Sequence, residues 1–213
     1  MSHQKTIYSF IGLPASGKGT QASILAKKIK AKVIGIGDLI RETIKDTGDD
    51  PFLIDIKKRY DDGTPQPDAV AIDLVTAYLG NIDSDVIFDN FPFSNGQAEF
   101  LSNYLSKHSE WEIIIIYIEL APETAIRRAT SRKICSGCGA IYEATDEMIC
   151  KKCGGSLAVR SDDNEETVRA RISQYLPKIN EVIKYFENSN SKIIKVDGEK
   201  SIEEVSGEIA SKI

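Results

Sequence analysis

The chain has 213 residues, of which 41% are hydrophobic and 28% charged, as in an ordinary globular protein with one sizeable core. Its net charge of −5 excludes an overall basic surface for nucleic acid, so an anionic ligand would need a local cluster of Arg and Lys. No apolar run reaches the roughly 20 residues of a membrane span, and the start lacks a signal-peptide pattern, so we expect a cytoplasmic protein without a membrane partner.

Short apolar runs alternate with longer amphipathic segments along the chain. The expected strands are 6–11, 32–36, 86–88, 112–118 and 192–196. The expected helices are 18–30, 38–46, 52–61, 68–79, 95–107, 122–133, 164–188 and 201–213. Because strands such as IIIIYI are apolar throughout, the pattern predicts a doubly wound α/β fold with a parallel sheet covered on both faces. Ligands of such folds bind beyond the carboxyl ends of the strands.

The first strand is followed by GLPASGKGTQ, residues 12–21, and then by a helix. Gly12, four residues, Gly17 and Lys18 have the spacing of a phosphate-binding loop. In such a loop the backbone N–H groups and the helix N-terminus face the phosphates, and the lysine adds a point charge. The usual Ser or Thr after the lysine is Gly19, with Thr20 one place later. A plain strand-to-helix turn is the alternative, and the position between strand and helix argues against it.

Two stretches interrupt the alternation, 38–79 without an obvious strand and the Gly- and Cys-rich 134–160, and both look like insertions in one core. The second contains two CxxC pairs, Cys135 with Cys138 and Cys150 with Cys153. Two such pairs with following glycines predict a structural zinc site of four thiolates. A redox CxxC and an iron–sulfur cluster are the alternatives.

Several charged residues suit a phosphate-handling site. Asp89 stands at the exit of a buried strand, where an α/β enzyme places a working carboxylate. Arg128 and Arg132 share a helix face, and Arg160 and Arg171 follow the Cys-rich stretch. Arginines around one insertion could neutralise phosphate oxygens during phosphoryl transfer. The alternative for each is a solvated helix face.

GLPASGKGTQ, GDLIRE, FDNFP, the paired CxxC motifs, RSDDNEETVRARI and KVDG together resemble the adenylate kinase family of nucleoside monophosphate kinases, in its long-lid, zinc-bearing form. The resemblance covers nearly the whole chain. It implies a P-loop core of five parallel strands over 1–37, 69–132 and 162–213, a monophosphate-binding insertion over 38–68 and a zinc-bearing lid over 133–161. It also implies a monomer that transfers the γ-phosphoryl group of Mg-ATP reversibly to a nucleoside monophosphate.

By matching motif, the resemblance implies a set of residues for the donor and the chemistry. The donor-binding residues would be Gly12, Ala15, Ser16, Gly17, Lys18, Gly19, Thr20, Arg128 and Lys200. The catalytic residues would be Lys18, Asp89, Arg128, Arg132, Arg160 and Arg171. Asp89 would orient waters on Mg²⁺, and the backbone near Lys200 would touch the donor base. The family also implies a cis peptide at Phe91–Pro92.

The acceptor side departs most from the family. Its residues would be Ile36, Asp38, Arg41, Gln66, Phe93 and Gln97, with Arg160 and Arg171. Ile36 replaces a threonine, Asn90 replaces a glycine and Phe93 replaces an arginine that contacts the acceptor phosphate. Losing such a charged contact costs on the order of 1.5–3 kcal/mol, so Phe93→Arg is predicted to raise AMP turnover by about one to two orders of magnitude. Phe93 either reshapes the acceptor pocket or reflects sequence drift onto an unused apolar patch.

Three functions remain open on these residues. An active kinase is favoured, with AMP as the acceptor and a pyrimidine or deoxynucleoside monophosphate as the first alternative. A nucleotide-binding module that phosphorylates poorly would also keep an intact donor side beside an altered acceptor side. The acidic net charge and the few aromatic residues near the CxxC pairs argue against a zinc-ribbon nucleic-acid binder.

Overall fold

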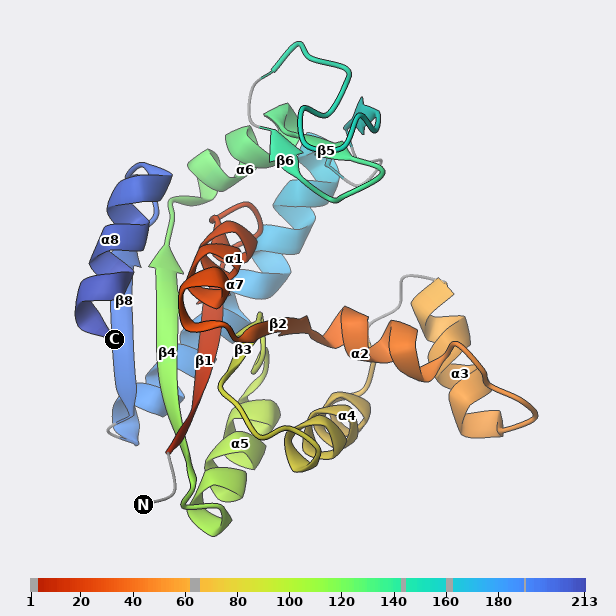
Figure 1. The fold of residues 1–213 in the computed structure, drawn as a ribbon, viewed down its shortest axis with the longest axis vertical. Coiled ribbons are helices and arrows are strands. Elements are labelled where there is room, and N and C mark those ends of the chain that lie inside the picture. Colours follow the sequence, from red (N-terminus) through yellow and green to blue (C-terminus); the bar gives the residue numbers. More distant parts are fainter. Residues whose placement is uncertain (1–3, 62–65, 143–144, 160–162, 190) are drawn as a thin grey trace.

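The protein is represented by a computed structural model, which describes residues 4–61, 66–142, 145–159, 163–189 and 191–213. Its centre is a five-stranded parallel sheet in the order β2-β3-β1-β4-β8 (Figure 1). The strands are β1 (Lys5–Gly12), β2 (Lys32–Gly35), β3 (Val86–Asp89), β4 (Trp111–Glu119) and β8 (Lys192–Asp197). The predicted α/β fold with five parallel strands is confirmed.

Helices cover both faces of this sheet. Among the described residues, the helices are α1 (Lys18–Ile29), α2 (Ile36–Thr43), α3 (Pro51–Asp61), α4 (Asp68–Gly80), α5 (Asn95–Lys107), α6 (Pro122–Ser131), α7 (Glu165–Asn188) and α8 (Ile202–Lys212), of which α2 and α3 do not cover the sheet. Alternate residues of β4 enter different cores: Ile113 and Ile115 pack with α4 to α7, whereas Ile114 and Ile116 pack with α1 and α8. The apolar run therefore has no polar face because both of its faces are buried.

The strand register brings three loops to the same edge of the sheet. Asp89, at the end of β3, lies opposite Gly35 of β2 on one side and Phe10 of β1 on the other. Gly12, the last residue of β1, lies opposite Ile118 of β4. The carboxyl ends of these strands therefore face one region, where a doubly wound fold binds its ligand.

Several expected boundaries are shifted; the helix expected over 38–46, for example, spans Ile36–Thr43. At two boundaries the structure has a different element from the one expected. Ile36 opens α2 instead of ending β2, because the Asp38 carboxylate accepts a hydrogen bond from the Gly35 N–H at 2.9 Å and caps the helix. The helix expected over 122–133 ends at Ser131, because Lys133 begins strand β5. Both errors lie where a helix meets another element, and such boundaries carry the weakest sequence signal.

Parts of the two interrupting stretches project from the core, whereas α4, at the end of the first stretch, packs in the core (Figure 1). One carries α2 and α3, which extend away from the edge of the sheet at β2. The other holds a small antiparallel sheet in the order β6-β5-β7, beyond the end of α6. Its strands are β5 (Lys133–Cys135), β6 (Ile141–Tyr142) and β7 (Leu157–Ala158).

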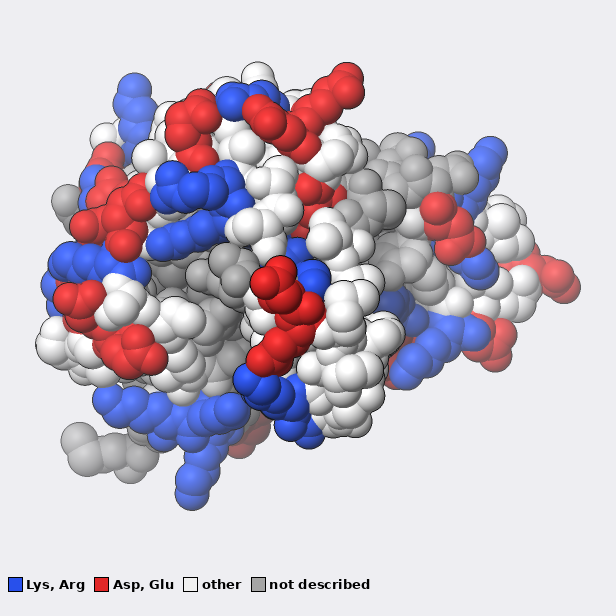
Figure 2. All heavy atoms as spheres, turned by 90° about the horizontal axis from the view of Figure 1, so that it is seen from above, with Lys and Arg blue, Asp and Glu red and all other residues white. Residues whose placement is uncertain are grey.

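Within the described ranges, no helix has both the length and the apolar character needed to cross a bilayer. On the face seen in Figure 2, acidic and basic side chains lie interspersed, so this face carries no extended patch of one sign.

Candidate active site

The glycine loop has the backbone that phosphate binding requires. Gly17 caps α1 in the left-handed region, with φ of 94°. A Cβ at Gly12 would lie 2.7 Å from the Ile118 carbonyl oxygen, so the close approach of β1 to β4 requires glycine there. The loop therefore ends at the N-terminus of α1, where the first N–H groups of the helix could face an anion.

Lys18 lies against the carbonyl groups of its own loop. Its Nζ donates to the Gly12 and Leu13 carbonyl oxygens at 2.9 and 2.7 Å. Burial lowers the pKa of Lys18 to about 8, against the opposing effect of the nearby Asp89 carboxylate. An anion beside the ammonium would favour its charged form.

Asp89 faces the same loop from β3. Its Oδ2 lies 3.4 Å from the position that a Cβ on Gly19 would take, so the carboxylate packs against the start of α1. Burial raises the pKa of Asp89, Lys18 lowers it, and Asp38 raises it further. The next residue, Asn90, has φ of 63°, which Asn tolerates better than most residues, so it can stand where the family has glycine.

Two arginines are fixed by partners in the core. Arg128 donates to the Gly198 carbonyl oxygen at 2.8 Å. Arg132 makes a bidentate pair with Asp163, with N···O distances of 2.7 and 2.8 Å, and the side chain of Asp163 is fully buried. Arg169, by contrast, pairs at the surface with Glu123 and Glu165.

The predicted donor residues meet at one large cavity. It has a volume of about 360 Å³. The sequence-predicted residues that line it are Ala15, Ser16, Gly17, Lys18, Gly19, Thr20, Asp89, Arg128, Arg132 and Arg171. A smaller cavity of about 240 Å³ shares Ser16, Gly17 and Thr20 with it and extends to Lys200. The cavity beside the glycine loop and the smaller cavity are therefore contiguous.

Of the predicted acceptor residues that the structure describes, Arg171 lines the larger cavity, and the others line neither of the two. Gln97 is buried: its Nε2 donates to Asp68 at 2.7 Å and its Oε1 accepts the Phe93 N–H at 2.8 Å. Arg41 pairs with Asp38 and donates to the Tyr60 hydroxyl.

Two further acceptor residues pack away from the cavity lining. Gln66 donates through Nε2 to the Ile56 carbonyl oxygen at 2.8 Å, and its buried Oε1 has no partner among the described residues. Phe93 follows the cis Phe91–Pro92 peptide, as expected, and contacts Tyr175, with ring centroids 4.5 Å apart. The ring of Phe93 therefore reaches the wall of the larger cavity through Tyr175.

One predicted site residue is not described by the structure, and three further residues at the site were not predicted. Arg160 lies outside the described residues. Asp163, Tyr175 and Asp68 were not predicted as site residues. Tyr175 stands four residues after Arg171 on one helix face, which is a usable signal. Asp163 was visible only as half of an Asp pair, and nothing local links Asp68 to Gln97.

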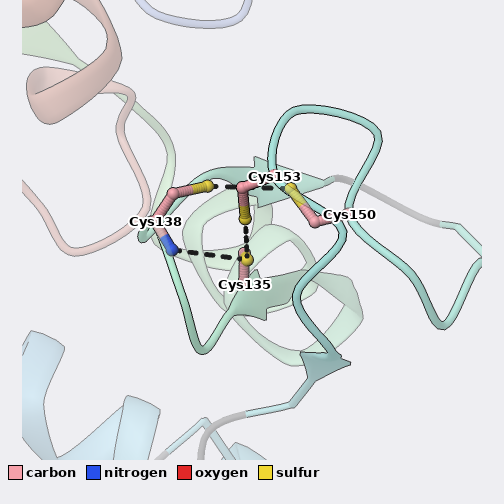
Figure 3. A group of neighbouring side chains, drawn as sticks. All are labelled: Cys135, Cys138, Cys150 and Cys153. Carbon is pink, nitrogen blue, oxygen red and sulfur yellow. Dashed lines mark hydrogen bonds between the residues drawn. The ribbon is translucent and has the colours of Figure 1, made fainter.

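The four cysteines form one cluster beside β5 (Figure 3). All four side chains point toward one another, and their sulfur atoms lie within 4.8 Å of each other. A tetrahedral site with metal–sulfur bonds of about 2.3 Å separates its sulfur atoms by roughly 3.8 Å. The cluster could therefore hold a metal ion with little rearrangement.

Neighbouring groups favour the thiolate form of two of the four cysteines, Cys135 and Cys150. The N–H groups of Gly137 and Cys138 donate to Cys135 Sγ at 3.3 and 3.4 Å. The Tyr142 hydroxyl, 3.4 Å from Cys150 Sγ, lowers the pKa of that thiol to about 6. A Cβ on Gly155 would lie 3.0 Å from Cys135 Sγ, so glycine makes room for the sulfur.

Comparisons with known proteins place the chain beside enzymes of one kind. The family model described as "Adenylate kinase" matches residues 10–191. The adenylate kinase of Dehalococcoides mccartyi is 36% identical over 211 residues, covering 96% of each chain. Those of Staphylococcus epidermidis and Acholeplasma laidlawii are 34% and 32% identical, each covering 93% of this chain and 94% of the relative.

Proposed function

The chain belongs to the adenylate kinase family of nucleoside monophosphate kinases, and we propose that it transfers the γ-phosphoryl group of Mg-ATP reversibly to AMP. One observation carries the proposal: Lys18, Asp89, Arg128, Arg132 and Arg171 line a single cavity at the carboxyl edge of the sheet. Phosphoryl transfer depends on positioning and on neutralising charge spread over several oxygens, and this cavity supplies both.

The donor would occupy both cavities. Its phosphates would lie along the loop from Gly12 to Thr20, and its base would enter the smaller cavity beside Lys200. The shared residues of the two cavities support a ligand that spans them. Mg²⁺, when bound with ATP, would neutralise phosphate charge, and the Asp89 carboxylate suits the hard oxygen coordination that this ion prefers.

The arginines would stabilise charge without acting as acids or bases. Asp163 holds the guanidinium of Arg132 through two bonds, so its position is set before the substrate arrives. Such preorganised groups stabilise a developing charge without reorganisation at the moment of reaction. No general base is needed, because alignment and charge neutralisation carry the rate.

The acceptor base would be read by Gln97. Asp68 and the Phe93 N–H fix the amide, so it cannot flip without losing both bonds. Each amide atom keeps capacity for one more bond. A base that accepts from Nε2 through a ring nitrogen and donates to Oε1 through an amino group would fit, which describes adenine and also cytosine. Guanine and uracil present a carbonyl beside a ring N–H instead.

A nucleotide-binding module with weak or no kinase activity is the second candidate. The position of Arg41 favours it, because this predicted phosphate ligand is paired with Asp38 and Tyr60 instead of facing the larger cavity. The cytosine-bearing and deoxynucleoside monophosphates are the alternative acceptors for an active enzyme, since Ile36 offers no hydroxyl to an adenine.

One assay separates these functions. The full chain is incubated with Mg-ATP and each of AMP, CMP, GMP, UMP and their deoxy forms, and the diphosphate is measured. We expect the fastest turnover with AMP. Turnover with CMP alone would identify CMP, not AMP, as the acceptor. Tight ATP binding without any turnover would support the nucleotide-binding module without kinase activity. Lys18→Met serves as the control for contaminating kinase activity.

We also propose that the cysteine cluster holds structural zinc and that segments 38–68 and 133–161 close over the substrates. Four thiolates leave zinc no open position, so the ion would stiffen its segment without taking part in the reaction. One zinc per chain is expected by elemental analysis. Its removal should unfold the segment around β5 while the sheet keeps its amide protection. A metal-free protein with an unchanged melting curve would contradict this.

A further inference from the structure

Cationic and aromatic side chains alternate along one face of α7 and meet the loop after β3. The Arg171 guanidinium lies 5.9 Å from the ring centroid of Tyr175, and the edge of Tyr175 meets the ring of Phe93. The Nζ of Lys178 lies 5.2 Å from the ring centroid of Phe93. Residues 171, 175 and 178 follow the i, i+4, i+7 spacing of one helix face. We name the side chains of Arg171, Tyr175 and Lys178, together with that of Phe93 from the loop after β3, the α7 row.

The α7 row leads from the proposed transfer site toward the acceptor residues. Arg171 and Tyr175 line the larger cavity together with Lys18 and Asp89. At its other end, the backbone N–H of Phe93 is hydrogen-bonded to Gln97. Lys178 therefore brings a positive charge to the side of the site where the acceptor would lie.

An acceptor monophosphate carries close to two negative charges that need cations. Arg41 already pairs with Asp38, and Phe93 adds no charge of its own. We infer that Lys178 on α7 binds the phosphate group of the acceptor nucleotide, an inference that rests on the proposed kinase function.

Phe93 acts in this arrangement as the support for Lys178. An ammonium over an aromatic face is attracted to the ring, which restricts a long and otherwise mobile side chain. The ring is itself held by its edge contact with Tyr175. Because the side chain of residue 93 points at Lys178, an arginine there would bring a second positive charge to the same place. The positive charge that holds the phosphate thus comes from Lys178 on α7 instead of from residue 93 in the loop after β3.

Substitution of Lys178 tests the inference on the full chain. Lys178→Met keeps much of the length of the side chain and removes its charge, and Lys178→Arg keeps the charge. Lys184→Met, at an exposed site of the same helix, is the matched control. AMP binding is measured by calorimetry, and the KM values for AMP and ATP are measured by steady-state kinetics. We expect Lys178→Met to weaken AMP binding and raise its KM by roughly ten- to a hundredfold, with the KM for ATP unchanged.

A charge relocation sharpens the test. Phe93→Arg alone should gain little, in contrast to the increase expected from the sequence, because Lys178 already supplies the charge. In the Lys178→Met background, Phe93→Arg should recover at least half of the lost AMP affinity on a logarithmic scale. Equal AMP binding by Lys178→Met and Lys184→Met would overturn the inference. A protein that binds AMP but phosphorylates nothing would refute the kinase function while the binding data still decide the role of Lys178. A protein that binds none of the nucleoside monophosphates in the assay would refute both.

Discussion

The proposed donor and acceptor sides hold their charged groups in different ways. On the donor side, Arg132 pairs with Asp163, and these side chains are 12% and 0% exposed. On the acceptor side, Arg41 pairs with Asp38, and both side chains are more than half exposed. The donor side is therefore built into the core, whereas the acceptor side pairs its charges with each other near solvent.

This difference bears on how the two substrates would bind. A group fixed by a buried partner meets its ligand without reorganisation, so little binding energy is lost in ordering it. Arg41 would have to leave Asp38 before it could hold a phosphate. We therefore expect ATP to meet an Arg132 side chain that is already in place, and AMP binding to require rearrangement around Arg41.

The largest effect is expected at the buried pair. Asp163→Ala leaves Arg132 mostly buried without its carboxylate, and breaking such a pair typically costs about 3–5 kcal/mol of unfolding free energy. Asp55→Ala is the matched change in the exposed Asp55–Arg59 pair of α3, where we expect a loss below about 1 kcal/mol. Urea unfolding of both variants measures the contrast. Similar losses would mean that the two sides do not differ in how charge is held.

The second prediction concerns the pH dependence of the donor side. The pKa of Lys18 is lowered to about 8 in the ligand-free protein, and phosphates beside the ammonium should raise it again. Below pH 8 the lysine is charged with or without ligand. Above pH 8, ATP binding must add a proton, so the ATP affinity should fall by up to about tenfold per pH unit.

The sign for stability is opposite to that for binding. A lysine whose pKa is lowered on folding leaves the unfolded chain with more bound protons between about pH 8 and about pH 10.4, so Lys18 makes the folded protein more stable as pH rises through this window. Calorimetry of ATP binding at pH 9, in two buffers of different ionisation enthalpy, should show proton uptake approaching one. The same experiment at pH 7 should show little, and equal uptake at both values would contradict the assignment to Lys18.

The sequence predicted the sheet, the glycine loop and the cysteine cluster because each is contiguous or closely spaced. The conformation of the loop 12–20 is determined by residues within the loop itself. The spacing of the two CxxC pairs brings the four cysteine sulfur atoms together within one small sheet. Partners that are distant in the chain could not be predicted in this way. Asp68 lies 29 residues from Gln97, and Lys178 meets Phe93 only because α7 packs beside the loop after β3. These contacts belong to the tertiary packing.

The third prediction concerns the hydrogen bonds that fix the side-chain amide of Gln97. Asp68→Asn leaves one acceptor oxygen where the carboxylate now receives both Gln97 Nε2 and the Ser94 hydroxyl. The amide of Gln97 should gain freedom, with the KM for AMP rising roughly three- to tenfold and the preference for AMP over GMP falling. Asp73→Asn, exposed on the same helix, is the control. A lower AMP affinity with an unchanged AMP-to-GMP ratio would mean that Asp68 supports the pocket without orienting the amide.

The smallest effect tests whether the donor side is free of strain. Ala15 has φ of 59°, a left-handed conformation that costs a residue with a Cβ about 1–2 kcal/mol. Glycine removes this strain but adds freedom to the unfolded chain, so Ala15→Gly should raise the unfolding free energy by at most about 1 kcal/mol. Lys30→Gly makes the same change at the C-cap of α1, where φ is also 59°, and should stabilise similarly. If Ala15→Gly alone also weakens ATP binding, then the strained alanine holds the loop in its binding shape. Rigidity of the donor side would in that case depend on local strain as well as on buried partners.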